Sequence, residues 1–61
     1  MNLAQFLEVI DGGEVIRVSD YNDHRALYVG KKVDCPAIDA RVISVWTCTT
    51  SGDAKIIIEV A

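Results

Sequence analysis

The sequence predicts a small α+β domain, in which an N-terminal amphipathic helix packs on a four-stranded, mainly antiparallel sheet with a short helical turn between its second and third strands. Three observations lead to this prediction. Apolar residues near the N-terminus recur at helical spacing, four later segments alternate apolar and polar residues as strands do, and turn-forming residues separate those segments. The 61 residues are few enough for one domain, 1–61, and a hydrophobic content of 51% is enough to form a core.

Residues 1–13 contain the signals of a short helix. Asn2 can cap its N-terminus, and Gln5, three residues later, can complete a capping box. Gly12 and Gly13 supply a stop signal. The apolar residues of one helical face follow the spacing i, i+3, i+4, i+7 and are Leu3, Phe6, Leu7 and Ile10. Because the helix begins at a methionine, we expect the chain to be a complete protein.

Four segments after the glycines have the period-two alternation of strands. They are residues 14–19, 26–33, 41–48 and 54–60. Gly30, inside the second segment, is typical of a bulge. Between the second and third segments, Pro36 suits the first position of a short helical turn, with Ile38 as its apolar contact. Because short turns join consecutive strands, we expect antiparallel pairing.

The alternation also assigns side chains to the two faces of the sheet. In the last segment, Ile56, Ile58 and Val60 are expected to face the core, whereas Lys55 and Glu59 are expected to face outward. The face of each strand then decides which apolar residues remain outside the core.

The face of Trp46 matters most for function, and the sequence leaves it open. Alternation places Val42 and Ser44 on the same face as Trp46, and this face is either the core face or the one away from the helix, because a one-residue shift exchanges the two. On the outer face, Trp46 would lie beside Ile57 with charged residues around them, a composition typical of a contact hot spot. The candidate protein-binding residues are Trp46, Ile57, Arg41, Lys55 and Glu59.

Charge and hydropathy disfavour two classes of partner. Nine acidic and six basic residues give a net charge of −3, and only Lys31 and Lys32 are adjacent basic residues, so nucleic-acid binding is disfavoured. A nucleic-acid contact is the less favoured alternative, and it would use Arg17, Arg25, Lys31 and Lys32 on one hairpin. No apolar run approaches the ~20 residues that span a bilayer, and residues 1–13 lack the basic start of a signal peptide. We therefore expect a cytoplasmic protein without a membrane partner.

The sequence indicates no catalytic, metal or cofactor site. His24 is the single histidine, and the Asp residues near it lie in predicted turns, where Asp is a common turn former. Cys35 and Cys48 are too few for a closed zinc site. Cys35 comes just before the turn predicted at Pro36, where a helix N-terminus would lower its pKa, but no second catalytic group is apparent. We expect a protein that is not an enzyme and binds no cofactor.

Six segments spread over the chain carry a family resemblance: residues 3–11, 15–18, 27–30, 34–36, 41–45 and 56–60. In these segments the chain resembles a group of short, mostly uncharacterised proteins encoded by phages, prophages and related mobile elements of Gram-positive bacteria. Cys35 is a departure, since similar chains tend to have an aliphatic residue there. The matching residues belong to the core and turns, so the resemblance implies no site residue. It implies an accessory protein of a mobile element in a bacterial cytoplasm.

Many accessory proteins of this kind bind a host protein, and inhibitors of bacterial defence nucleases are among them. The leading hypothesis is therefore a non-enzymatic protein that binds a host protein, such as a component of a defence system. The alternative is a structural homo-oligomer, for example a homodimer that pairs through its sheets or edge strands. Val60 lies one residue from the C-terminus, so the last strand is predicted to be an edge.

Overall fold

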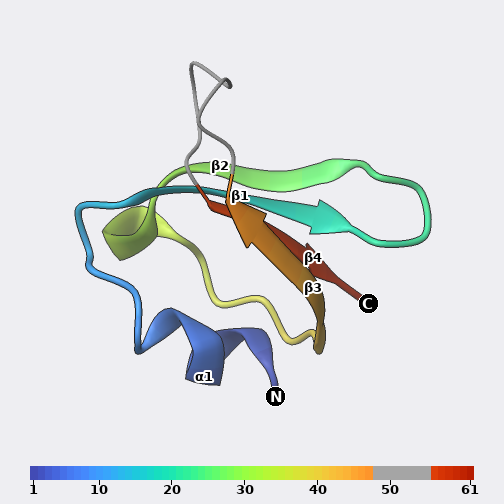
Figure 1. The fold of residues 1–61 in the computed structure, drawn as a ribbon, viewed down its shortest axis with the longest axis horizontal. Helices are drawn as coiled ribbons and strands as arrows, with labels where there is room; N and C mark the ends of the chain where they lie inside the picture. The colour runs from blue at the N-terminus through green and yellow to red at the C-terminus, as the bar shows by residue number, and fades with distance from the viewer. Residues whose placement is uncertain (48–55) are drawn as a thin grey trace.

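The computed structural model describes residues 1–47 and 56–61, which form a small α+β domain with one four-stranded sheet (Figure 1). The elements in chain order are helix α1 (Leu3–Leu7), strands β1 (Val15–Asp20) and β2 (Ala26–Lys31), the 3-10 turn η1 (Lys32–Asp34), and strands β3 (Val42–Thr47) and β4 (Ile56–Val60). The four strands lie within one or two residues of the segments whose alternation predicts them.

The sheet is mixed and mainly antiparallel, and its strand order is β2-β1-β4-β3. β1 pairs antiparallel with β2, and β4 pairs antiparallel with β3, whereas the two central strands β1 and β4 run parallel (Figure 1). The prediction that the last strand is an edge is wrong, because β4 lies between β1 and β3. The edge strands are β2 and β3. The connection from β2 to β3 crosses to the far edge of the sheet, so that β4 can pair with β1 between them.

The core lies on one face of the sheet, where α1 and residues 35–40 cover it. Leu3 of α1 is fully buried, and Cys35 and Ile38 pack against the same cluster. The buried apolar residues of the sheet are Ile16, Val18, Ile58 and Val60. The inward orientation predicted for alternate residues of β4 is confirmed, because Ile58 and Val60 are buried and Ile56 packs against them.

The helix begins as expected but ends early. Gln5 donates its backbone N–H to the Asn2 side chain at 2.8 Å, and Asn2 donates its own to the Gln5 side chain at 3.0 Å, which completes the capping box. The helix ends at Leu7 rather than near the glycines. The N–H groups of Val9 and Ile10 donate to carbonyls three residues back, as in a tighter 3-10 turn. Both residues are β-branched, which lowers helix propensity.

Among residues 1–47 and 56–61, no helix has the length and apolar character needed to cross a membrane.

The predicted position of the helical turn, at Pro36, is wrong. The structure has a 3-10 turn directly after β2 at Lys32–Asp34, and residues 35–40 have no regular secondary structure. Cys35 closes this turn by donating its N–H to the Lys32 carbonyl at 3.0 Å. Cys35 itself is extended, with φ −66° and ψ 126°. A residue before proline is restricted to this conformation, so Pro36 ends the turn instead of beginning it.

A bulge in β3 changes the face of its first residue. The register with β4 shifts between Val42 and Ser44. Val42 therefore packs on the core side opposite Val60, whereas Ser44 and Trp46 lie on the other face. The prediction that Val42 shares a face with Trp46 is wrong because one extra residue in the strand reverses the alternation.

Gly30 allows a tyrosine ring to lie close to the backbone of β2, and it is not the bulge that the sequence predicts. It pairs in register with Ile16, and its φ is +156°. A Cβ at this position would lie 2.6 Å from the Tyr28 hydroxyl oxygen. That hydroxyl donates a hydrogen bond to the Lys31 carbonyl at 2.6 Å, which holds the ring over Gly30.

We expect Gly30→Ala to destabilise the fold by about 2 kcal/mol, because the added Cβ strains the backbone and displaces the Tyr28 ring. The matched control is Gly13→Ala, since a Cβ at Gly13 would meet no atom within 4 Å. That variant should stay within about 0.5 kcal/mol of wild type. Urea unfolding followed by circular dichroism measures both, and equal stabilities for the two variants would contradict the role of the glycine.

Candidate functional site

A row of four side chains crosses the sheet on the face away from α1. Trp46 of β3 lies opposite Ile57 of β4, Ile57 lies opposite Arg17 of β1, and Arg17 lies opposite Val29 of β2. Residues directly opposite each other share a face of the sheet, and in the two antiparallel pairs their Cβ atoms are about 4.5–5.5 Å apart. These four residues, Val29, Arg17, Ile57 and Trp46, are called the open-face row below.

The two ends of the open-face row are exposed. Trp46 is 46% exposed and Val29 47%, while Ile57 between them is half-buried and Arg17 is exposed. The sequence leaves open which face of the sheet Trp46 occupies. In the structure Trp46 lies on the face away from the core. A tryptophan side chain has a large apolar area, and contiguous exposed apolar area is typical of an interaction surface.

A second row on the same face is polar. Glu59 of β4 lies between Ser44 of β3 and Ser19 of β1. Glu59 is only 7% exposed and Ser19 only 4%. Glu59 was expected to face solvent, and it does lie on the outer face. It is nevertheless buried, with its carboxylate 3.1 Å from the Nδ1 atom of His24 in a salt bridge when the imidazole is charged.

The loop between β1 and β2 presents His24 to Glu59. Its Asp residues act as turn formers: the Asp20 carboxylate accepts the N–H of Asn22 at 2.8 Å, and the Asp23 carboxylate accepts that of Arg25 at 2.9 Å. His24 has a positive φ of 59°, which is uncommon for a residue other than glycine. The loop thus holds the imidazole beside the polar row, where it contacts the Glu59 carboxylate.

The predicted rim of charges around Trp46 is rearranged. Arg41 lies five residues before Trp46, about 16 Å away along an extended chain. Its backbone exchanges hydrogen bonds with Ala61 at 3.0 and 3.1 Å. Lys55 lies outside the described residues. The cation that the structure brings into the row is Arg17, and sequence reasoning missed this role because no local pattern shows that β1 and β4 are parallel neighbours.

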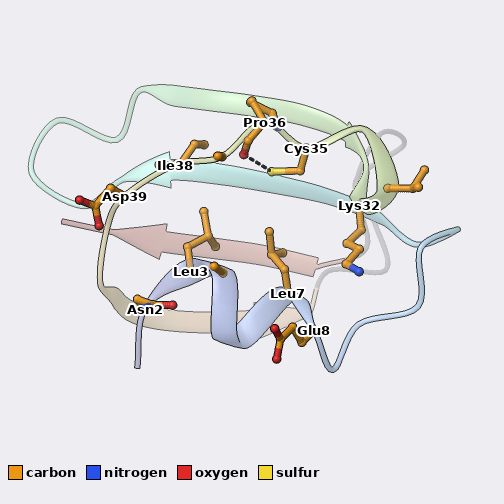
Figure 2. Close-up of a pocket in the computed structure, with 12 residues that line it drawn as sticks. Asn2, Leu3, Leu7, Glu8, Lys32, Cys35, Pro36, Ile38 and Asp39 are labelled. Atoms are coloured by element: carbon orange, nitrogen blue, oxygen red, sulfur yellow. Dashed lines mark hydrogen bonds between the residues drawn. The ribbon is translucent and has the colours of Figure 1, made fainter.

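The four cations considered for nucleic-acid contact do not share one surface. Arg17 and Lys31 lie on the face of the open-face row, since Lys31 pairs with Val15. Lys32 instead lines a groove on the α1 side (Figure 2). Among the residues that the structure describes, no carboxylate lies within salt-bridge distance of Arg17.

The groove, of about 600 Å³, lies between α1 and residues 32–39. Figure 2 shows Leu3 and Leu7 on its helical side, with Asn2 and Asp39 at one end and Glu8 and Lys32 at the other. The remaining lining residues are Ala4, Val33, Cys35, Pro36, Ala37 and Ile38. Its walls are mostly apolar, and its charged groups are spread along the rim.

Cys35 lies in this groove in a setting that disfavours its thiolate. Burial raises the pKa of the thiol, whose Sγ atom donates to the Pro36 carbonyl at 3.5 Å. Cys35 follows the C-terminal end of η1, which lacks the positive field of a helix N-terminus. Burial also raises the pKa of the Tyr28 hydroxyl, and the charges of Asp34 and Cys35 add to this effect. Reactive cysteines have the opposite shift.

The open-face row is composed of apolar side chains and one cation. It combines two aliphatic side chains with an aromatic ring and a guanidinium, and aromatic residues and arginine are enriched at the centres of protein interfaces. Among residues 1–47 and 56–61, no three His, Cys, Asp or Glu side chains come together in a way that would hold a metal ion. No protein-family model, curated protein or solved structure matches the chain.

The raised pKa of Cys35 predicts slow thiol chemistry at neutral pH. In a Cys48→Ser variant, which leaves Cys35 as the single thiol, a disulfide reagent should react more slowly with the folded chain than with the chain in urea. The rate should rise with pH and continue to rise beyond pH 9.0, the ordinary pKa of a cysteine thiol, because the raised pKa of Cys35 means that its thiolate fraction is still increasing there. A rate that levels off below pH 8 would contradict this assignment.

Proposed function

We propose that the chain is a non-enzymatic accessory protein of a phage or mobile element, and that it binds a protein of its bacterial host through the open-face row. The observation that carries the proposal is Trp46, which is 46% exposed and in register with Ile57 and Arg17. Tryptophan and arginine are enriched among residues that dominate binding energy. The resemblance to phage and prophage proteins supports the origin, the bacterial cytoplasm as location, and a defence component as target.

The size of the molecule limits how such a partner is bound. A standard interface takes about 800 Å² from each protein, which is about a fifth of the 4005 Å² that this chain exposes. Most of one sheet face is needed to supply that area. Affinity then depends on a few well-placed residues rather than on a large contact, and Trp46 is the largest exposed side chain available on this face.

The charges on this face favour a partner of a particular chemistry. The chain has a net charge of −3, but Arg17 and Lys31 give the β1–β2 side of the open face a positive character. The one carboxylate of the polar row, Glu59, is buried and held by His24. A complementary surface is apolar opposite Trp46 and Val29 and has a carboxylate opposite Arg17.

We expect Trp46→Ala to abolish capture of this partner. Tagged wild-type chain in lysate of a Gram-positive host should retain a specific protein, identified by mass spectrometry, and the variant should bind that purified protein about 30-fold more weakly or worse, the loss typical of a hot-spot residue. The control is Val9→Ala, because Val9 is 78% exposed and lies outside the sheet.

Circular dichroism must show that Trp46→Ala remains folded. Equal binding by Trp46→Ala and wild type would rule out the open-face row as the contact surface. Equal loss in Val9→Ala would show that the capture does not depend on this face.

Arg17 supplies a test of the charge in the row. Arg17→Glu should weaken the purified complex more than Arg17→Ala, because it places a carboxylate opposite the acidic group expected on the partner. The affinity of wild type should fall as salt is raised, and that of Arg17→Ala should fall less. Titrations at two salt concentrations measure this difference, and identical salt dependence would remove Arg17 from the contact.

A further inference from the structure

Strand β3 is an edge of the four-stranded sheet. Within the part of the chain that the structure describes, pairing on the side away from β4 is limited to the beginning of the strand: Val42 donates its N–H to the Met1 carbonyl at 3.0 Å, and Asn2 forms a bridge with Arg41. From residue 43 to 47, no strand of the described part of the chain lies beside it. An edge of this kind presents unpaired N–H and C=O groups to any strand that can align with it.

The side chains of β3 lack the charges that commonly prevent an edge strand from pairing with another strand. Val42–Thr47 contains no charged residue, and Ile43 and Val45 are each 38% exposed. Natural edge strands are commonly protected by charges, lysine above all. The other edge strand, β2, follows this rule, since it contains Lys31. The two edges of the sheet therefore differ in their ability to accept another strand.

We propose that the occupant of the β3 edge is a second copy of this chain, paired antiparallel about a two-fold axis so that two four-stranded sheets become one continuous sheet. This inference does not rest on the proposed host-binding function.

The sequence of β3 is compatible with itself in this arrangement. With the axis at Val45, the two Val45 residues face each other, Ser44 faces Trp46 of the second copy, and Ile43 faces Thr47 of the second copy. These are apolar or neutral pairs of the kind that stabilise cross-strand contacts. The same operation on β2, centred at Tyr28, would place Arg25 opposite Lys31 of the second copy, and like charges directly opposite are destabilising.

The pairing also covers exposed apolar area. On the open face the two Trp46 residues become diagonal neighbours, about 7–8 Å apart, within reach of aromatic rings. A five-residue strand pair is smaller than the 1,200–2,000 Å² of a standard interface, so the dimer should dissociate on dilution. The joined sheet would present two open-face rows side by side.

Sedimentation equilibrium over a concentration series tests the proposal. Wild type should show a monomer–dimer equilibrium, and Val45→Lys should weaken dimerisation at least tenfold, because it sets two lysines opposite each other at the axis. Val45 lies outside the core cluster, so this variant should keep its circular dichroism spectrum. The matched control is Leu27→Lys on β2, since Leu27 is also 38% exposed on an edge strand. It should dimerise like wild type.

A wild-type chain that remains monomeric at millimolar concentration would overturn the proposal, and so would equal weakening by Val45→Lys and Leu27→Lys. Host-protein capture separates this proposal from the previous one, because Val45→Lys leaves the open-face row intact and should still bind the partner.

A cross-link locates the axis independently of stability. Opposed residues of antiparallel strands have Cα atoms about 4.5–5.5 Å apart, within the range that a disulfide spans. With Cys35 and Cys48 replaced by alanine, Val45→Cys should form a disulfide-linked dimer in oxidised glutathione. Val29→Cys on β2 should remain monomeric under the same conditions. Cross-linking through Val29→Cys but not Val45→Cys would place the interface at the other edge and contradict the proposal.

Discussion

The parallel pairing of β1 with β4 is the contact on which the rest of the structure depends. It joins the first and last strands from Ile16 opposite Ile56 to Asp20 opposite Val60. On one face this register brings Val18 beside Ile58 beneath the helix. On the other face the same register sets Arg17 opposite Ile57. The same β1–β4 register therefore determines both the core and the open-face row. A shift of this register by one residue would move the core side chains of a strand to the open face and the open-face side chains to the core.

The local features of this fold could be predicted from the sequence, but the neighbours of each strand could not. The Asn2 capping box depends on residues three apart, and the inward orientation of Ile58 and Val60 depends on alternation within one strand. Strand order depends on pairing between segments forty residues apart, about which a local period carries no information. For this reason β4 was expected at an edge, whereas it is central and the edge strands are β2 and β3.

The candidate site was also predictable only in part, because it too depends on contacts between distant segments. Trp46 and Ile57 were recognised as possible neighbours, and they are paired. The face they share depends on the bulge before Ser44, and a strict period of two does not reveal an inserted residue. The burial of Glu59 depends on His24 reaching it from a loop thirty-five residues earlier. Long-range contacts of this kind decide which polar groups remain exposed on this face, and Arg17 is one of the exposed groups.

The most direct test of this account is a nuclear Overhauser spectrum of the free chain at low concentration. The protein has one tryptophan, so the indole protons of Trp46 are unambiguous. The structure predicts contacts from the indole to the methyl groups of Ile57, and from Ile57 to the side chain of Arg17. Contacts from the indole to Leu3 or Ile58 would instead place Trp46 in the core, and they would contradict both the register and the open-face row.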